Sequence, residues 1–337
     1  MESPLWTDRH QPTLDELPQE DTRRYLRQVS AGPVNLLLHG PSGAGKTAAV
    51  KALAAELHDD PANDLFTINI ADFFGMTKQE LVNDPRFRRF VDAKRRQGSK
   101  TKLINHLLKE MAGYPPVSGS FKTILLDNAE AMRADFQQSL RRVMEQYYEA
   151  TQFVIVTRRA SAIIDPIRSR CAQVPIRAPT EGEMVDVLER IVTREKVEYD
   201  REGLEYLASY ADGDLRRAIL ATQTTAVDSD TITMTTAYEA LDEVGHDDAL
   251  VDLLQAAESG DFDTSRGMLD DLIIEHGYDG DELLTALLRV ARTRYEPESV
   301  VALYRLAGEI EFDLAQGAND RVHLSHFIAR LHPEVTA

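Results

Sequence analysis

The stretch from Gly40 to Thr47 constrains this chain more than any other. It reads Gly40-Pro41-Ser42-Gly43-Ala44-Gly45-Lys46-Thr47 and matches the phosphate-binding pattern G-x-x-x-x-G-K-[ST] at every position. The apolar run 35–39 comes directly before it and is typical of a buried parallel strand. Strong helix formers follow from Ala48 to Leu57. Strand, glycine-rich loop and helix together predict an α/β domain that binds a nucleoside triphosphate.

Each part of the motif has a chemical role toward a triphosphate. The glycines let the backbone curl so that N–H groups face a phosphate, and the helix N-terminus adds its dipole. Lys46 supplies a positive charge, and Thr47 supplies a hydroxyl for Mg²⁺. A second apolar strand, 123–127, ends in Asp127, where a P-loop ATPase needs its Mg²⁺-ordering carboxylate. We therefore expect ATP and Mg²⁺ as cofactors, bound by residues 40–48 and Asp127.

The order of hydrophobic patterns indicates several domains, as expected for 337 residues. Predicted strands at 35–39, 65–70, 123–127, 152–157 and 172–176 alternate with helices up to about Pro179. From Thr180 to about Thr225 the pattern is purely helical, and a second all-helical region runs from about Asp230 to Leu331. We predict an α/β domain with a parallel sheet between helices over 1–179, a helical lid over 180–228 and an all-α domain over 229–337.

Composition excludes several classes of protein. No apolar run approaches the roughly 20 residues that a membrane span needs. The segment Met1 to His10 lacks the apolar core of a signal peptide. Cys171 is the only cysteine, which excludes a disulfide framework and a cysteine-based zinc module. These features predict a cytoplasmic protein with no membrane partner.

The chain is strongly acidic, with a formal net charge of −18. Only nine of its 38 basic residues are lysine, a balance that resembles proteins from salt-accumulating halophiles. An ordinary acidic cytoplasmic protein is the alternative. Such a surface repels nucleic acid on average, so any contact with DNA needs a local basic region.

One such region lies between Asp84 and Lys102. Its candidates for DNA contact are Arg86, Arg88, Arg89, Lys94, Arg95 and Arg96, and Lys100 and Lys102 add to its charge. The stretch either binds the phosphates of DNA, forms a solvated basic loop, or docks an acidic surface of another subunit. The sequence leaves these three alternatives open.

Six further segments follow one another in a characteristic order. They are Trp6 to Leu17, Asn69-Ile70-Ala71-Asp72, Leu140 to Glu145, Ile164 to Cys171, Gly213 to Ala218, and Gly317 to Leu324. With the phosphate loop, this order resembles the AAA+ family. It is most similar to the small subunits of archaeal and eukaryotic replication factor C, the sliding-clamp loader. The resemblance covers nearly the whole chain.

This resemblance implies roles for individual residues. Arg170, in Ser169-Arg170-Cys171, would act as an arginine finger in the ATP site of a neighbouring subunit. Arg216 would touch the γ-phosphate in its own site and report the nucleotide state to the lid. The last domain would be a collar that holds the ring together. Implied partners are the other small and large clamp-loader subunits in a hetero-oligomeric ring, a sliding clamp and primer–template DNA, with a location at the nucleoid.

The chain also departs from the family pattern at positions that matter for hydrolysis. Asn128 stands where the family has its catalytic glutamate, and an amide cannot take a proton as a carboxylate can. Glu130 would replace it only if the backbone were re-aimed, because strand residues i and i+2 share a face but not a position. Arg158 replaces the sensor 1 asparagine, and Arg9-His10-Gln11 alters the segment that borders the adenine. We expect weak ATP hydrolysis.

Two other functions remain compatible with the sequence. One is an autonomous, DNA-dependent AAA+ ATPase such as an initiator or helicase, although no basic winged-helix pattern follows the collar-like segment. The other is an alternative clamp-loader subunit that serves DNA repair.

Overall fold

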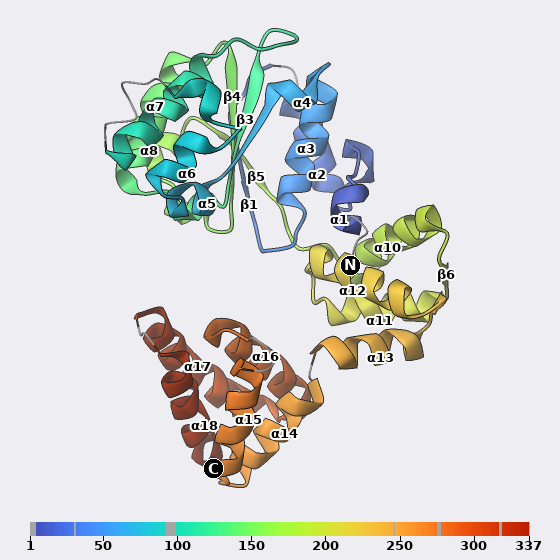
Figure 1. Cartoon of the computed structure of the whole chain (residues 1–337). Helices are drawn as coiled ribbons and strands as arrows, with labels where there is room; N and C mark the ends of the chain where they lie inside the picture. The colour runs from blue at the N-terminus through green and yellow to red at the C-terminus, as the bar shows by residue number, and fades with distance from the viewer. Residues whose placement is uncertain are drawn as a thin grey trace. The chain divides into compact units, whose positions relative to one another are not determined.

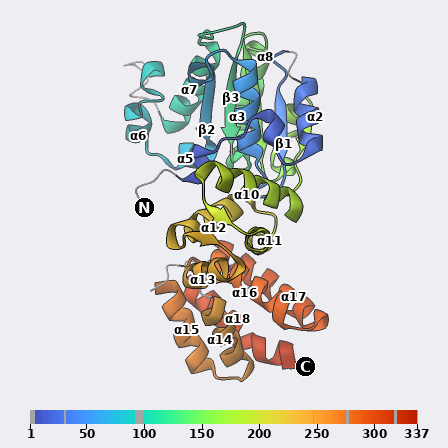
Figure 2. The ribbon, with the colours of Figure 1, turned by 90° about the vertical axis from the view of Figure 1, so that its right-hand side faces the viewer.

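The computed structural model describes residues 5–29, 32–91, 99–245, 247–274, 278–316 and 319–336. The chain divides into two compact units, Met1–Tyr238 and Glu239–Ala337 (Figures 1 and 2). Among these residues, no helix is both long enough and apolar enough to cross a bilayer. The predicted lid, 180–228, belongs to the first unit.

The first unit is built on a five-stranded sheet in the order β2-β3-β4-β1-β5. Every neighbouring pair of strands is parallel. The strands are β1 Leu36–His39, β2 Leu65–Asn69, β3 Lys122–Asp127, β4 Thr151–Thr157 and β5 Ala172–Pro175. All five strands predicted from the sequence are confirmed. Because the strands run the same way, their carboxyl ends meet at one edge of the sheet.

Helices cover both faces of this sheet (Figure 1). Leu37 of β1 packs into the core beneath α5–α8, whereas Leu36 and Leu38 face the core that contains α3. The helices here are α1 Trp6–Arg9, α2 Glu20–Val29, α3 Lys46–Leu57, α4 Pro61–Asp64, α5 Ile70–Gly75, α6 Lys78–Asn83, α7 Lys100–Gly113, α8 Ala134–Gln146 and α9 Asp165–Arg168. Burial on both faces explains why the strands read as continuous apolar runs.

The lid follows the sheet and is helical except for one short strand pair. Its helices are α10 Glu181–Glu195, α11 Arg201–Tyr210 and α12 Leu215–Asp228, and α13 Met234–Gly245 follows the lid. The prediction of a purely helical pattern is wrong at Glu198–Tyr199 (β6), which pairs in parallel with Thr231–Ile232 (β7). Strands of two residues are too short to show an alternating pattern, so hydrophobic periodicity does not detect them.

The second unit is a bundle of helices (Figure 2). They are α14 Asp247–Glu258, α15 Phe262–Ile274, α16 Gly280–Arg294, α17 Pro297–Gln316 and α18 Asp320–Thr336. Their buried leucines, isoleucines and phenylalanines form one core. Residues 259–261 separate α14 from α15, and residues 295–296 separate α16 from α17. Gly317 and Ala318, in the collar-like segment, lie outside the described residues.

One lysine of the first unit is fully buried. Lys122, at the start of β3, has an exposed fraction of 0%. Its ammonium group donates hydrogen bonds to the carbonyl oxygens of Ala112, at 2.9 Å, and of Tyr114. These carbonyls lie at the C-terminal end of α7, where helical partners run out. Burial lowers the pKa of Lys122 to about 8, against the opposing effect of the Asp64 carboxylate.

We predict that Lys122→Met removes part of the pH dependence of the free energy of unfolding. The folded protein releases the Lys122 proton near pH 8, whereas the unfolded chain releases it near pH ~10.4. Between these values the unfolded chain binds more protons, so wild-type stability rises with pH relative to the variant. Chemical denaturation at about pH 7.5 and about pH 10 measures this difference. A stability difference that does not change with pH would contradict the assignment.

Candidate functional site

The glycine-rich motif forms the loop between β1 and α3. Gly45 caps α3 in the left-handed backbone region, with φ of 88°. The Lys46 ammonium curls back into the loop and donates to the carbonyl oxygens of Gly40, at 2.9 Å, and of Pro41. Burial lowers the pKa of Lys46, while Asp127 and Glu130 oppose that shift. The loop thus gathers a cation and a helix N-terminus at one point, as the sequence predicts.

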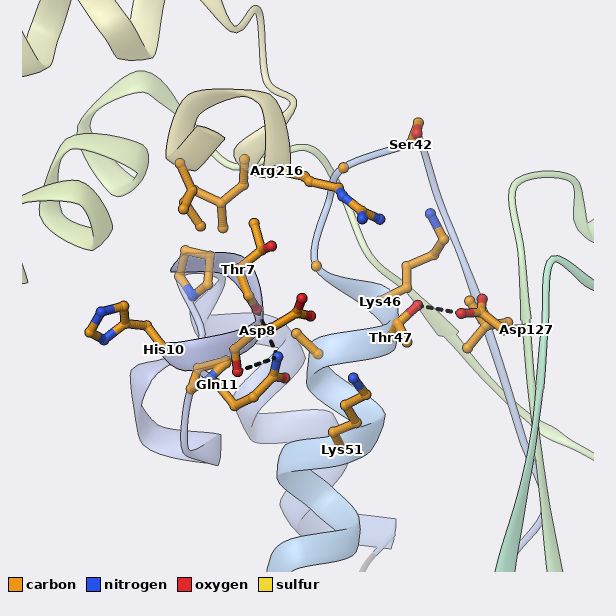
Figure 3. Close-up of a pocket in the computed structure, with 18 of the residues that line it drawn as sticks. Thr7, Asp8, His10, Gln11, Ser42, Lys46, Thr47, Lys51, Asp127 and Arg216 are labelled. Atoms are coloured by element: carbon orange, nitrogen blue, oxygen red, sulfur yellow. Dashed lines mark hydrogen bonds between the residues drawn. The ribbon is translucent and has the colours of Figure 1, made fainter. Parts of the chain in front are cut away.

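Thr47 and Asp127 meet beside the loop. Thr47 Oγ1 donates a hydrogen bond of 2.8 Å to Asp127 Oδ2 (Figure 3). Thr47 lies in the first turn of α3, and Asp127 is the last residue of β3. One hydroxyl and one carboxylate, completed by phosphate oxygens and waters, suit Mg²⁺. The structure therefore brings together the two residues that the sequence assigns to the metal ion.

The chain turns sharply after Asp127. Asn128 lies in the left-handed region, with φ of 52° and ψ of 45°, and a short 3₁₀ helix, Ala129–Ala131, follows. The backbone therefore changes direction at Asn128, and Glu130 lies in the 3₁₀ helix and not in an extension of β3. The Glu130 carboxylate accepts hydrogen bonds from Thr157 Oγ1 at 2.8 Å, the Arg158 backbone N–H at 3.1 Å and Arg158 Nε at 2.8 Å.

The charge of Glu130 is fixed by these contacts. Burial opposes its ionisation, but the hydrogen bonds from the Arg158 side chain, the backbone and Thr157 prevail. They lower the pKa of Glu130 to about 2. Glu130 is therefore a carboxylate paired with Arg158 at any pH near neutrality.

The lid contacts the phosphate loop directly. The Leu215 N–H donates to the Gly43 carbonyl oxygen at 3.2 Å. Asp214 caps α12 by accepting from the Arg217 N–H at 3.0 Å. A Cβ added to Gly43 would lie 2.0 Å from Asp214 Oδ1, and Gly43 has φ of 65°. Arg216, next along α12, is exposed and extends toward the loop (Figure 3). The predicted nucleotide-sensing residue thus lies where the lid meets the loop.

The N-terminal segment closes the other end of the site. Trp6 is buried, and its backbone N–H donates to Gln223 Oε1 of α12 at 2.8 Å. The side chains of Arg9 and His10 bind Glu195, at the end of α10. These three contacts join residues that lie more than 180 positions apart in the sequence, with separations of 217, 186 and 185.

Gln11 and Thr7 occupy the same end of the site. The Gln11 side-chain amide donates to the Thr7 carbonyl oxygen at 2.7 Å (Figure 3). Thr7 Oγ1 is buried and has no hydrogen-bond partner within the described part of the chain. An unsatisfied hydroxyl of this kind can pair with a polar group of a ligand.

These parts surround one cavity of about 610 Å³, which is a suitable size for a nucleotide. Predicted residues that line it are Ser42, Gly43, Gly45, Lys46, Thr47, Ala48, Asp127, Asn128, Arg158 and Arg216. Sequence reasoning missed other residues that line it, including Thr7, Lys51, Arg190 and Arg194. Only the helical period of 186–195 could have indicated that Arg190 and Arg194 share a face.

Arg170 lies outside this cavity. Its guanidinium donates 2.6 Å hydrogen bonds to Glu145 Oε1 and to the Pro166 carbonyl oxygen. The Arg170 and Glu145 side chains are 40% and 45% exposed. An exposed ion pair of this kind contributes only about 0.2–1 kcal/mol, so Arg170 exchanges partners at little cost.

The described candidates for DNA contact, Arg86, Arg88 and Arg89, differ in their surroundings. Arg86 pairs with Asp84 at 2.6 Å, and the Arg89 guanidinium lies 4.8–5.1 Å from the ring centres of Phe66, Phe90 and Tyr114. Arg88 is exposed and has no ion pair within the residues that the structure describes. Lys94, Arg95 and Arg96 lie outside the described residues.

Comparisons with known proteins agree with this organisation. The model of the ATPase family associated with various cellular activities (AAA) matches residues 36–177. The model of the RCF1/5-like AAA+ ATPase lid domain matches 186–227, and that of the replication factor C C-terminal domain matches 245–330.

Individual proteins resemble the chain along its length. The replication factor C small subunit of Archaeoglobus fulgidus is 33% identical, with 97% of each chain covered. Those of Staphylothermus marinus and Methanocella arvoryzae are 32% and 31% identical; the alignments cover 97% of this chain and 94% and 96% of theirs. A structure of a Thermotoga maritima RuvB variant matches with a TM-score of 0.53 at 16% identity. It covers 82% of this chain and 85% of that chain, and shows the likeness of fold alone.

We predict that Gly43→Ala weakens nucleotide binding by about tenfold, because a left-handed backbone costs a non-glycine residue about 1–2 kcal/mol. The added methyl group also displaces Asp214, and with it the start of α12. Gly182→Ala in α10 is the matched control, since an added Cβ there meets nothing within 4 Å. Calorimetric titration with nucleotide compares the two variants. Equal affinities would show that the contact between loop and lid does not matter for binding.

Proposed function

The chain belongs to the replication factor C small-subunit family of AAA+ ATPases, and from this premise we propose that it serves a clamp loader by binding ATP while hydrolysing it slowly. The observation that carries the proposal is the composition of the nucleotide cavity. Lys46, Thr47, Asp127 and Arg216 line it, as binding requires, and Asn128 lines it where the family resemblance places a catalytic glutamate.

The residues present fit Mg²⁺-ATP. Among the residues that the structure describes, the hydrogen-bond acceptors of Lys46 are backbone carbonyl oxygens, and a phosphate oxygen is a stronger acceptor for an ammonium group. Thr47 and Asp127 would hold Mg²⁺, which would neutralise charge on the phosphates. Thr7, with its unpaired hydroxyl, and Gln11 would border the base.

Slow hydrolysis follows from the groups near the attacking water. The Asn128 amide accepts no proton from water, and Arg158 positions water less well than a sensor 1 asparagine would. Glu130 is close enough to line the cavity, but Thr157 and Arg158 hold its carboxylate. We propose that the subunit works as a nucleotide-dependent switch more than as a source of ATP turnover.

We expect the purified chain to bind Mg²⁺-ATP with negligible steady-state turnover. Asn128→Glu should raise turnover by about 10²–10⁴-fold, the usual contribution of a positioned general base. Asn128→Gln is the matched control, because it has the same length and no carboxylate. Phosphate release in high KCl, with and without primed DNA, is the measurement. Robust turnover by the wild-type chain would show that another group acts as the base.

We further propose that Arg170 acts on a neighbouring subunit. The support is its place outside the chain's own cavity and the weak, exposed ion pair that holds it. The partners would be other small and large subunits in a hetero-oligomeric ring, which loads a sliding clamp onto primer–template DNA. That work implies a location beside the chromosome. Arg88, with its exposed side chain, is the best-placed described candidate for DNA contact.

Arg170→Ala in the assembled ring should lower ATP turnover by a neighbouring subunit by a factor of about 10³ or more, as loss of an arginine finger does. Arg168→Ala is the control, since that side chain belongs to the same turn and pairs with Asp165. Turnover is measured in rings where only the neighbouring site is competent. An unchanged rate would exclude Arg170 as the finger.

A further inference from the structure

The ion pair between Glu130 and Arg158 lies at the phosphate end of the cavity. Arg158 directly follows β4, and β4 lies between β3, which ends in Asp127, and β1, which leads into the phosphate loop. The Gly40 N–H donates to the Thr157 carbonyl oxygen at 3.3 Å, so Arg158 is adjacent to the start of the loop. The sheet therefore places its guanidinium beside the position of a terminal phosphate.

The two partners are held very differently. The Glu130 side chain is 10% exposed, whereas that of Arg158 is 62% exposed. If the Arg158 side chain moved away, the Glu130 carboxylate would keep its hydrogen bonds from Thr157 Oγ1 and from the Arg158 backbone N–H. No buried carboxylate would be left without partners, so the exchange costs little. Arg158 is therefore the partner that can exchange, and Glu130 is the partner that other contacts hold in place.

We propose that Glu130 and Arg158 form an exchangeable latch, in which the Glu130 carboxylate and the terminal phosphate of ATP compete for the Arg158 guanidinium. Arginine binds carboxylate and phosphate in the same forked geometry, which makes the two anions competitors for one site. The inference rests on the proposed function, because it requires ATP in this cavity. It makes Arg158 a residue that distinguishes ATP from ADP, since only the triphosphate reaches it.

In this latch, removing the charge of Glu130 strengthens ATP binding, whereas substitution of an ordinary binding residue weakens it. Glu130→Gln keeps the side-chain length and an acceptor for Thr157 but removes the competing charge. We expect it to raise ATP affinity by about two- to fivefold, the factor that corresponds to an exposed ion pair, and to leave ADP affinity unchanged. Arg158→Ala should lower ATP affinity and spare ADP affinity. When Arg158 is already alanine, Glu130→Gln should not change ATP affinity, because there is no Arg158 guanidinium for Glu130 to release.

The test is a double-mutant cycle on the full chain. Dissociation constants for Mg²⁺-ATP and Mg²⁺-ADP are measured by calorimetric titration for the wild type, Glu130→Gln, Arg158→Ala and the combination. Thermal unfolding confirms that all four proteins are folded. Coupling between the two substitutions for ATP, and its absence for ADP, is the expected result.

The measurements distinguish failure of the latch from failure of the proposed ATP binding. If Glu130→Gln raises ATP affinity equally with and without Arg158, the carboxylate acts by repelling phosphate, and the latch is overturned while ATP binding stands. Equal effects on ATP and ADP lead to the same conclusion. If the folded wild-type chain binds neither nucleotide, the proposed function fails, and the latch fails with it.

Discussion

The position of β4 between β3 and β1 is the constraint on which the nucleotide site depends. In a parallel sheet of this order, the carboxyl ends of three strands meet at one edge. That edge receives the phosphate loop from β1, Asp127 from β3 and Arg158 from β4. The hydrogen bond between Thr47 and Asp127 then ties α3 to β3 across this edge. Each group reaches the site because of where its strand ends.

The lid shares this constraint through backbone contacts. Asp214 lies so close to Gly43 that no side chain fits at position 43, and the Leu215 N–H donates to the Gly43 carbonyl oxygen, so the start of α12 is fixed relative to the phosphate loop. Trp6 anchors the N-terminal segment on the same helix through Gln223. A shift of α12 would therefore move both ends of the cavity together. We propose this coupling as a physical route by which the state of the nucleotide reaches the helical lid.

Two charged side chains, Glu130 and Arg158, lie together near the carboxyl ends of β3 and β4. Position 128 carries an amide, and the left-handed turn at Asn128 directs the Glu130 carboxylate toward β4. There the Glu130 carboxylate accepts a hydrogen bond from Arg158, and this ion pair restricts the chemistry of both groups. A held carboxylate is a poor base, and a held guanidinium is a poor phosphate ligand. Slow hydrolysis and discrimination between ATP and ADP would then share one cause.

The sequence by itself determined the phosphate loop, the five strands and the pairing of Thr47 with Asp127, because local patterns and strand ends carry that information. It also predicts that Asn128 and Arg158 depart from the family pattern. It could not show that Glu130 leaves the strand direction, since one left-handed residue decides this. Nor could it place Glu195 on His10 or Gln223 on Trp6, contacts across separations of 185 and 217 residues. Tertiary packing alone brings such distant side chains together, so only the folded structure revealed them.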